Sequence, residues 1–94
     1  MEVRRLHLII SGRVQGVGFR YFTYLTGTNL HLHGWVRNRT NGDVEVLAEG
    51  HQDNLDTFIQ EIKKGPQLAQ VIDLDMKWGE AQEDLPPFTI LSTG

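Results

Sequence analysis

Residues 3–20, Val-Arg-Arg-Leu-His-Leu-Ile-Ile-Ser-Gly-Arg-Val-Gln-Gly-Val-Gly-Phe-Arg, contain the change of pattern that decides the fold. Their first half is rich in β-forming residues and places Leu6, Leu8 and Ile10 on one face, which predicts a half-buried strand over residues 3–11. Three glycines then follow within seven residues and interrupt the strand pattern. A helical pattern begins directly after them, so the chain is expected to pass from strand to glycine-rich loop to helix.

The predicted helix begins at Phe19 and has an apolar face with a helical period. Four residues share that face: Phe19, Phe22, Thr26 and Leu30. Gly27 weakens the helix by about 1 kcal/mol relative to alanine, and the threonines are only modest helix formers. The helix is expected to end near His31, and Gly34 begins the next element.

Residues 35–40 and 43–49 predict a β-hairpin around Asn41-Gly42. A two-residue turn would place charged residues among the apolar ones, whereas a three-residue loop with Gly42 in the left-handed region avoids that mismatch. The favoured register puts Val36, Val44 and Val46 on one face and sets Arg37 opposite Glu45 and Arg39 opposite Asp43. It also puts Asn38 on the helix-facing side of its strand.

The rest of the chain completes a βαββαβ order. A second helix is predicted by the helical spacing of four apolar residues: Leu55, Phe58, Ile59 and Ile62. Gly65-Pro66 ends this helix, and strands are expected over residues 71–78 and, more briefly, 88–91. The connection rules then favour an α+β fold, a ferredoxin-like two-layer sandwich with an antiparallel sheet and two helices on one face. Residues 1–94 are expected to form a single domain.

Composition excludes several classes of protein. The 94 residues include no cysteine, which excludes disulfides, thiolate nucleophiles and cysteine-ligated zinc. No apolar run approaches the length of a membrane span, and the N-terminus leads directly into the first strand, so a signal peptide is not expected and the cytoplasm is the predicted compartment. The charge is asymmetric: residues 1–40 hold six arginines and one acid, whereas residues 41–94 hold three lysines and eleven acids. This asymmetry fits either a chance distribution or an anion site in the first part, since arginine offers a rigid fork for oxyanions.

The glycine-rich loop is the candidate anion site. A glycine-rich turn that leads into a helix exposes backbone N–H groups at the positive end of the helix dipole, and Arg20 lies in the first helical turn. The loop lacks the Lys-Ser/Thr of a Walker A motif and the third glycine of a dinucleotide fingerprint. Cysteine-dependent phosphatases carry their nucleophile six residues before the arginine, where this chain has Val14. If the site does chemistry, water must attack directly. The alternative is a tight strand-to-helix connection with Arg20 in a surface ion pair.

Several strings together resemble the acylphosphatase family. They are Gly12-Arg-Val-Gln-Gly-Val-Gly-Phe-Arg20, Gly34-Trp-Val-Arg-Asn38, Gly42-Asp-Val-Glu-Val, Ala48-Glu-Gly50, Lys64-Gly-Pro66 and Phe88-Thr-Ile90. The resemblance implies the ferredoxin-like fold and hydrolysis of carboxyl-phosphate anhydrides without metal or cofactor. It also implies that the ligands are a small acyl phosphate and inorganic phosphate or sulfate, and that the protein is a monomer.

The resemblance also implies the roles of individual residues. Arg20 is expected to bind the phosphate as the catalytic arginine, and Asn38 to position the attacking water. The phosphate cradle is expected to consist of the backbone amides of Gly12, Arg13, Val14, Gln15, Gly16, Val17 and Gly18. The sequence departs from the family pattern at Gly27, commonly alanine, and at His31, commonly the glycine that caps the first helix, so a looser helix is expected.

The chemistry explains why so few groups suffice. The leaving group is a carboxylate, which departs without a general acid. Asn38 offers an acceptor and a donor to hold a water but is no base, so a phosphate oxygen of the substrate is expected to take the proton. His7 as an essential base is the rival hypothesis. No histidine or carboxylate spacing typical of a metal site is present, and no metal is expected. Tyr21 and Tyr24 are interpreted as packing or surface residues.

Two other functions stay open at this stage. The same fold hosts RNA-binding domains that read nucleic acid on the outer sheet face, where Trp35, Arg37 and Arg39 are predicted to lie. Predicted pairing with acids and an isoelectric point near 5.7 argue against nucleic acid as a partner. A non-catalytic anion-binding module that kept the cradle without turnover is the second alternative.

Overall fold

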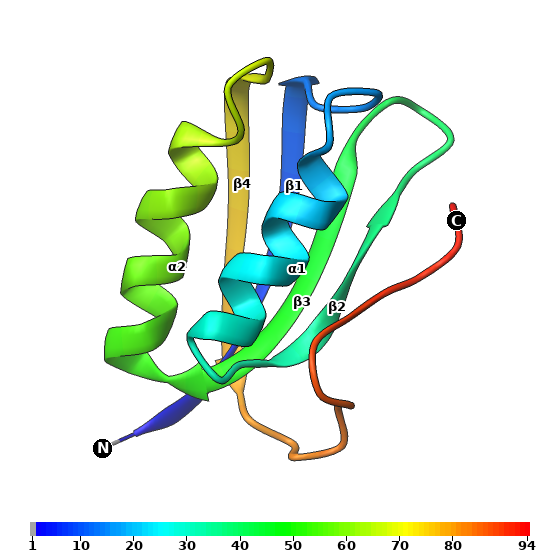
Figure 1. Ribbon diagram of the computed structural model, residues 1–94. Helices are drawn as coiled ribbons and strands as arrows, with labels where there is room; N and C mark the ends of the chain where they lie inside the picture. Colours follow the sequence, from blue (N-terminus) through cyan, green and yellow to red (C-terminus); the bar gives the residue numbers. More distant parts are fainter. Residues whose placement is uncertain (1) are drawn as a thin grey trace.

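The computed structural model describes residues 2–94 and places two helices on one face of a five-stranded sheet (Figure 1). The elements are β1 (Val3–Arg13), α1 (Phe19–Asn29), β2 (His33–Asn38), β3 (Val44–His51), α2 (Gln52–Lys64), β4 (Gln70–Glu80) and β5 (Thr89–Ile90). This arrangement confirms the predicted ferredoxin-like α+β sandwich. No helix within the described residues is long and apolar enough to cross a membrane.

The strand order is β4-β1-β3-β2-β5. Neighbours among the first four strands are antiparallel, as predicted, but β5 pairs with β2 in parallel, so the complete sheet is mixed. The reason is the path of the chain after β4. Residues 81–88 cross the end of the sheet to the edge opposite β4 (Figure 1). When the chain enters β5 it therefore runs in the direction opposite to β4, which is the direction of β2, and the β2–β5 pair is parallel.

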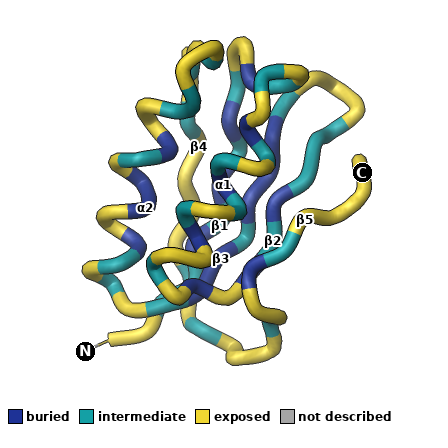
Figure 2. The backbone as a smooth tube through the Cα atoms, in the orientation of Figure 1, coloured by how far each residue is buried: buried dark blue, intermediate teal, exposed yellow. Residues whose placement is uncertain are grey.

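The core lies between the sheet and the helices (Figure 2). Leu6, Leu8 and Ile10 of β1 are fully buried, which confirms the predicted alternation. Across the layer, α2 contributes the four apolar residues that its spacing predicted: Leu55, Phe58, Ile59 and Ile62. The loop and both helices are thus mounted on one continuous apolar layer.

The β2–β3 hairpin adopts the favoured three-residue loop. Arg37 pairs with Glu45 and Val36 with Val46 across the two strands, and Gly42 has a φ of 98°. The expected side-chain meeting of Arg39 with Asp43 is wrong, because the long Arg39 side chain reaches Glu45 instead, at 3.3 Å.

The same register settles the position of the candidate water-binding residue. Asn38 lies opposite Val44, which is fully buried, and two residues beyond the buried Val36. Since side chains alternate along a strand, Asn38 lies on the helix-facing side of β2, as expected. The hairpin therefore delivers an amide side chain to the end of the sheet where β1 gives way to the glycine loop.

The buried face of α1 differs from the prediction. The most buried residues are Phe19, Thr23 and Gly27, whereas Phe22, Thr26 and Leu30 are half-buried. The helix is rotated because Gly27 packs directly against the ring of Phe88, where a Cβ atom would lie 2.6 Å from Cδ2. Gly27 therefore allows α1 to pack closely against Phe88, a contact that the sequence pattern alone did not indicate.

The end of α1 is closed by a Schellman motif in which histidine occupies the usual glycine position. His31 has a φ of 58°, in the left-handed region, and its N–H donates to Thr28 O at 3.0 Å. The N–H of the buried Leu32 donates to Gly27 O at 2.9 Å. These bonds satisfy carbonyls that a helix end otherwise leaves open, while His31 bears the steric cost of a left-handed conformation.

We predict that His31→Gly raises the free energy of unfolding by about 0.5–1 kcal/mol, because glycine adopts the left-handed region without a Cβ clash. The larger conformational entropy of glycine in the unfolded chain offsets only part of this gain. Urea denaturation followed by circular dichroism measures the change. His31→Ala is the matched control: it retains the clash and should give no gain. Equal stabilisation by both substitutions would contradict the strain at this position.

Candidate active site

The site begins where β1 ends. Of the seven residues expected to form the phosphate cradle, Gly12 and Arg13 still belong to β1 and pair with Val71 and Gln70 of β4 after a bulge. A Cβ atom at Gly12 would collide with the Gln70 carbonyl oxygen, so glycine is needed there for the strand contact. The remaining five residues, 14–18, form the loop itself.

Two glycines turn this loop into α1. Gly16 and Gly18 have φ values of 72° and 79°, and a Cβ atom at either would meet no other atom within 4 Å. Glycine is therefore required by the backbone conformation, and both residues border open space. Gly18 is the N-cap of α1, and the helix makes its first hydrogen bond from Phe22 N–H to Gly18 O, at 3.0 Å.

The N-terminus of α1 is open to an anion. No side chain caps it, and its first turn contains no acidic residue. The first N–H groups of a helix have no partner within the helix, and together they carry about half a positive charge. In the first turn of α1 this partial charge is joined by the full charge of Arg20.

Gln15 ties the loop to the hairpin. Its Nε2 donates to the carbonyl oxygens of Arg39 and Asp43, both at 2.8 Å. Both acceptors lie in the β2–β3 turn, directly after the strand that carries Asn38. Only the backbone amide of Gln15 was expected to belong to the site, but its side chain also connects the two halves of the site.

A cavity of about 320 Å³ brings the site together. Its lining comprises Val14, Gly16, Gly18, Phe19, Arg20, Tyr21, Asn38 and Ile90. Arg20 and Asn38, far apart in the sequence, thus border one space together with three residues of the glycine loop. Gly12, Arg13, Gln15 and Val17 do not line it. Tyr21 and Ile90 were missed by sequence analysis: no pattern indicated that β5 would bring Ile90 beside the loop.

Arg20 is free to bind a ligand. Arg4, Arg5, Arg37 and Arg39 each form an ion pair with a glutamate, whereas Arg20 forms none within residues 2–94. The interpretation of Arg20 as a member of a surface ion pair is therefore wrong. Its guanidinium presents a planar fork that matches two phosphate oxygens.

Asn38 carries an unsatisfied acceptor. Its Oδ1 is buried and has no hydrogen-bond partner among the described residues. A buried acceptor left unpaired typically costs about 1–3 kcal/mol, so such atoms are uncommon outside functional sites. Because Asn38 also lines the cavity that contains Arg20, its side-chain amide is a candidate partner for a ligand or a water there.

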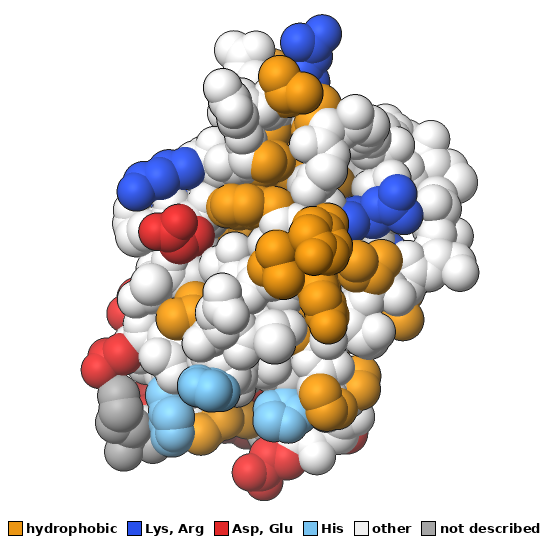
Figure 3. All heavy atoms as spheres, viewed as in Figure 1, with side chains coloured by type: hydrophobic (Ala, Val, Ile, Leu, Met, Phe, Trp, Pro, Cys, Tyr) orange, Lys and Arg blue, Asp and Glu red, His pale blue; other side chains and the backbone are white. Residues whose placement is uncertain are grey.

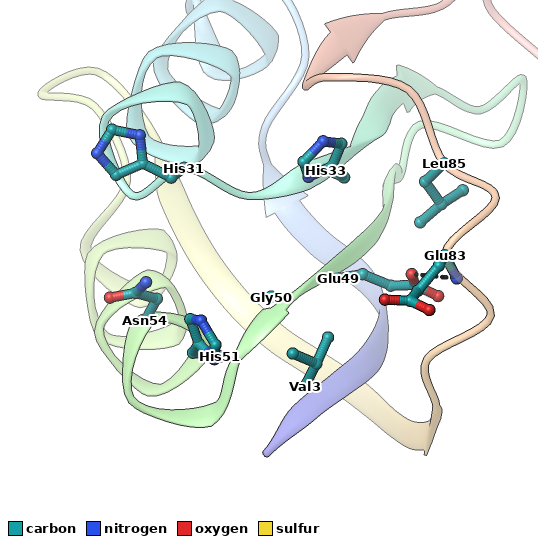
Figure 4. A pocket seen from close by; sticks show the side chains of 9 residues that line it. All are labelled: Val3, His31, His33, Glu49, Gly50, His51, Asn54, Glu83 and Leu85. Carbon is teal, nitrogen blue, oxygen red and sulfur yellow. Dashed lines mark hydrogen bonds between the residues drawn. The ribbon is translucent and has the colours of Figure 1, made fainter. Parts of the chain in front are cut away.

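A larger cavity, of about 450 Å³, lies at the other end of the sheet (Figure 4). Its lining comprises Val3, His31, His33, Glu49, Gly50, His51, Asn54, Glu83 and Leu85. The fold gathers three histidines that appeared unrelated in the sequence, yet no group of three metal-ligating side chains within residues 2–94 is arranged to hold a metal ion. Its two glutamates disfavour a phosphate dianion, so the smaller cavity is the better phosphate site.

The β2 arginine of the outer sheet face is paired within the chain. The Arg37 guanidinium lies 5.1 Å from the centre of the Trp35 ring and donates to Glu45 at 2.8 Å. Glu45 also bonds with His7, at 2.7 Å. Burial alone would raise the pKa of Glu45, but its hydrogen bonds with His7 and Arg37 hold that pKa below its usual range. Arg37 and Arg39, the arginines of this face, thus both pair with the same buried carboxylate.

Glu49 organises the other end of this face. It accepts hydrogen bonds from Arg5 Nε at 2.6 Å and from the amides of Gln82 and Glu83 at 2.9 and 3.0 Å. Burial alone would raise the pKa of Glu49, but the Gln82 amide and the Arg5 guanidinium outweigh it and lower the pKa. Glu49 thereby fixes the segment that carries the chain from β4 toward β5.

Taken together, the open helix terminus, the unpaired Arg20 and the glycine loop define a candidate anion site on a ferredoxin-like domain. The acylphosphatase family model matches residues 6–90. An acylphosphatase of Clostridium beijerinckii is 50% identical over 72 residues, which cover 77% of this chain and 80% of the relative. That of Bacillus subtilis is 40% identical over 84 residues, 89% of this chain and 92% of the relative.

The crystal structure of acylphosphatase from B. subtilis superposes on this chain with a TM-score of 0.91 at 39% sequence identity. The superposition covers 94% of this chain and 98% of the B. subtilis chain. The chain belongs to the acylphosphatase family, and its function is hydrolysis of acyl phosphates. The sequence resemblance is thereby confirmed, and a non-catalytic anion-binding or RNA-binding module is not favoured.

We predict that Glu49→Gln lowers the free energy of unfolding at pH 7 by about 1–3 kcal/mol, because it removes charge-assisted bonds from a buried carboxylate. The pKa of Glu49 is lower in the folded than in the unfolded chain, so its contribution is present above the unfolded pKa and is lost as pH falls through the folded value. The gap between wild type and variant should therefore close on acidification. Urea unfolding at several pH values measures it, and a gap that stays constant would contradict the assignment.

Proposed function

We propose that Arg20, Asn38 and the backbone amides of the Gly12–Gly18 segment form the catalytic site for carboxyl-phosphate hydrolysis. One observation carries the proposal: Arg20, which forms no ion pair within residues 2–94, and Asn38, whose Oδ1 has no hydrogen-bond partner there, line the same cavity at a helix N-terminus without a side-chain cap. The ligand is a small acyl phosphate, and inorganic phosphate, the product, or sulfate would occupy the same position.

The phosphoryl group is bound by complementary charge. Phosphoryl transfer passes through a loose transition state with charge spread over three equatorial oxygens. Arg20 supplies two donors in a fixed plane, and the loop and first-turn amides supply further donors that need no reorganisation during the reaction. Of the seven cradle residues, 14–18 are the ones that border the helix terminus, whereas Gly12 and Arg13 hold the loop to β4.

The attacking water is held by Asn38. Its Oδ1 accepts a hydrogen bond from the water and directs an oxygen lone pair at phosphorus, opposite the leaving carboxylate. A bond forms between the water oxygen and phosphorus while the bond from phosphorus to the acyl oxygen breaks. The water proton passes to a phosphoryl oxygen, so the products are a carboxylate and dihydrogen phosphate. No phosphoenzyme is formed.

His7 does not fit the role of general base. Its Nε2 lies 2.7 Å from Glu45 Oε2, on the sheet face opposite the helices, whereas Asn38 lies on the helix-facing side. The proposal requires no side-chain base, because the water proton passes to a phosphoryl oxygen of the substrate.

The remaining parts of the proposal concern the protein as a whole. Residues 1–94 act as one cytoplasmic domain, as a monomer, without nucleic acid, metal ion or cofactor. The match of the family model across residues 6–90 and the internal pairing of the outer-face arginines support this description.

We predict that Arg20→Ala and Asn38→Ala each lower kcat/KM for acetyl phosphate and benzoyl phosphate by at least about a hundredfold, since losing one preorganised donor costs roughly 3–4 kcal/mol of transition-state stabilisation. Arg20→Lys should recover little of the loss, because lysine keeps the charge and not the fork. Phosphate release in the presence of EDTA is the measurement.

His7→Ala is the control for this experiment and should retain a near-normal rate. Loss of activity on adding EDTA, or loss in His7→Ala while Arg20→Ala stays active, would contradict the proposed mechanism. Tight phosphate binding by a wild-type protein that releases no phosphate from either substrate would instead indicate a non-catalytic anion-binding module.

A further inference from the structure

The phosphate cavity has an apolar side. Tyr21 and Ile90 line it together with Arg20 and Asn38, and they are 61% and 39% exposed. Neither side chain adds a charge for a phosphate dianion. An apolar wall beside an anion cradle suits a ligand with one charged end and one apolar end, which is the general form of an acyl phosphate.

Both side chains are held in place by the fold. The Tyr21 ring stacks on the Tyr24 ring, with centroids 6.2 Å apart and planes inclined by 30°, and Tyr24 packs against the core. Ile90 lies beside Val36 in the β2–β5 ladder, and Leu91 N–H donates to Val36 O at 2.9 Å. The apolar wall is therefore preorganised, which lowers the entropic cost of binding against it.

The apolar surface continues outward from the cavity along α1. Leu25 is four residues after Tyr21, hence on the same helix face, and is 40% exposed. Figure 3 shows hydrophobic side chains gathered in the middle of the face that α1 presents to solvent. Isolated exposed apolar residues are ordinary on a protein surface, but here the exposed residues join the rim of a polar cavity.

We propose that Tyr21 and Ile90 form the subsite for the acyl group, and that the enzyme favours acyl phosphates with an aromatic or bulky apolar acyl group over acetyl phosphate. This inference rests on the proposed phosphate site, which fixes the charged end of the substrate between Arg20 and the loop amides. The acyl group then extends over the Tyr21 ring, where an aromatic ring removes apolar surface from water and a methyl group removes little.

The test compares two substrates that share the phosphoryl group and differ only in the acyl group. Tyr21→Ala should lower kcat/KM for benzoyl phosphate about tenfold, the effect expected for uncovering roughly 50 Å² of apolar surface, while kcat/KM for acetyl phosphate changes less than about twofold. The loss should appear mainly in KM, because the contact is made in both the ground state and the transition state. Ile90→Ala should shift the same ratio in the same direction by a smaller factor.

Two control variants sharpen the result. Tyr21→Phe should behave as wild type on both substrates, because the ring and not the hydroxyl makes the contact. Ile72→Ala removes a more exposed apolar side chain, 74% exposed and outside the cavity, and should leave the ratio of the two kcat/KM values unchanged.

The outcomes separate the subsite from the phosphate site. Equal losses on both substrates in Tyr21→Ala, no loss on either, or a loss in Tyr21→Phe as large as that in Tyr21→Ala would each overturn the subsite and leave the phosphate site standing. A wild-type protein that hydrolyses neither substrate would contradict the proposed function itself, and the subsite with it.

Discussion

The left-handed backbone at Gly16 and Gly18 is the constraint on which the site depends. These two residues turn the chain from β1 into α1 within five residues and leave the first turn of the helix without a side-chain cap. A capping serine or aspartate would satisfy those amides and exclude a phosphate. The N-terminus of α1 thus keeps backbone donors without a side-chain cap, as a bound anion would require.

The two halves of the site come from strands that are not neighbours in the sheet. Arg20 belongs to the helix after β1, and Asn38 belongs to β2, which is separated from β1 by β3. The Gln15 side chain bridges this separation through two carbonyl oxygens of the β2–β3 turn. Glu45 and Glu49 are paired with other arginines, and Arg20 forms no ion pair within residues 2–94.

Much of this arrangement could be predicted from the sequence because it depends on local rules. The alternation of apolar residues correctly predicted the buried face of β1. The two-residue turn would have mixed charged and apolar residues on one face, so the three-residue loop was favoured, and its register places Asn38 toward the helices. The predicted buried face of α1 and the all-antiparallel sheet were wrong, because both features depend on contacts between residues far apart in the sequence. Gly27 rotates α1 through its contact with Phe88, and β5 joins β2 in parallel only because of the path of residues 81–88. The position of Ile90 in the cavity lining depends on that same path.

The most direct test of the central claim is the fate of the attacking oxygen. Hydrolysis of benzoyl phosphate in water enriched in oxygen-18, followed by mass spectrometry of both products, identifies the atom that water attacks. Attack on phosphorus by a water that Asn38 holds predicts the label in inorganic phosphate and none in benzoate. Label in benzoate would show attack on the acyl carbon and contradict the account.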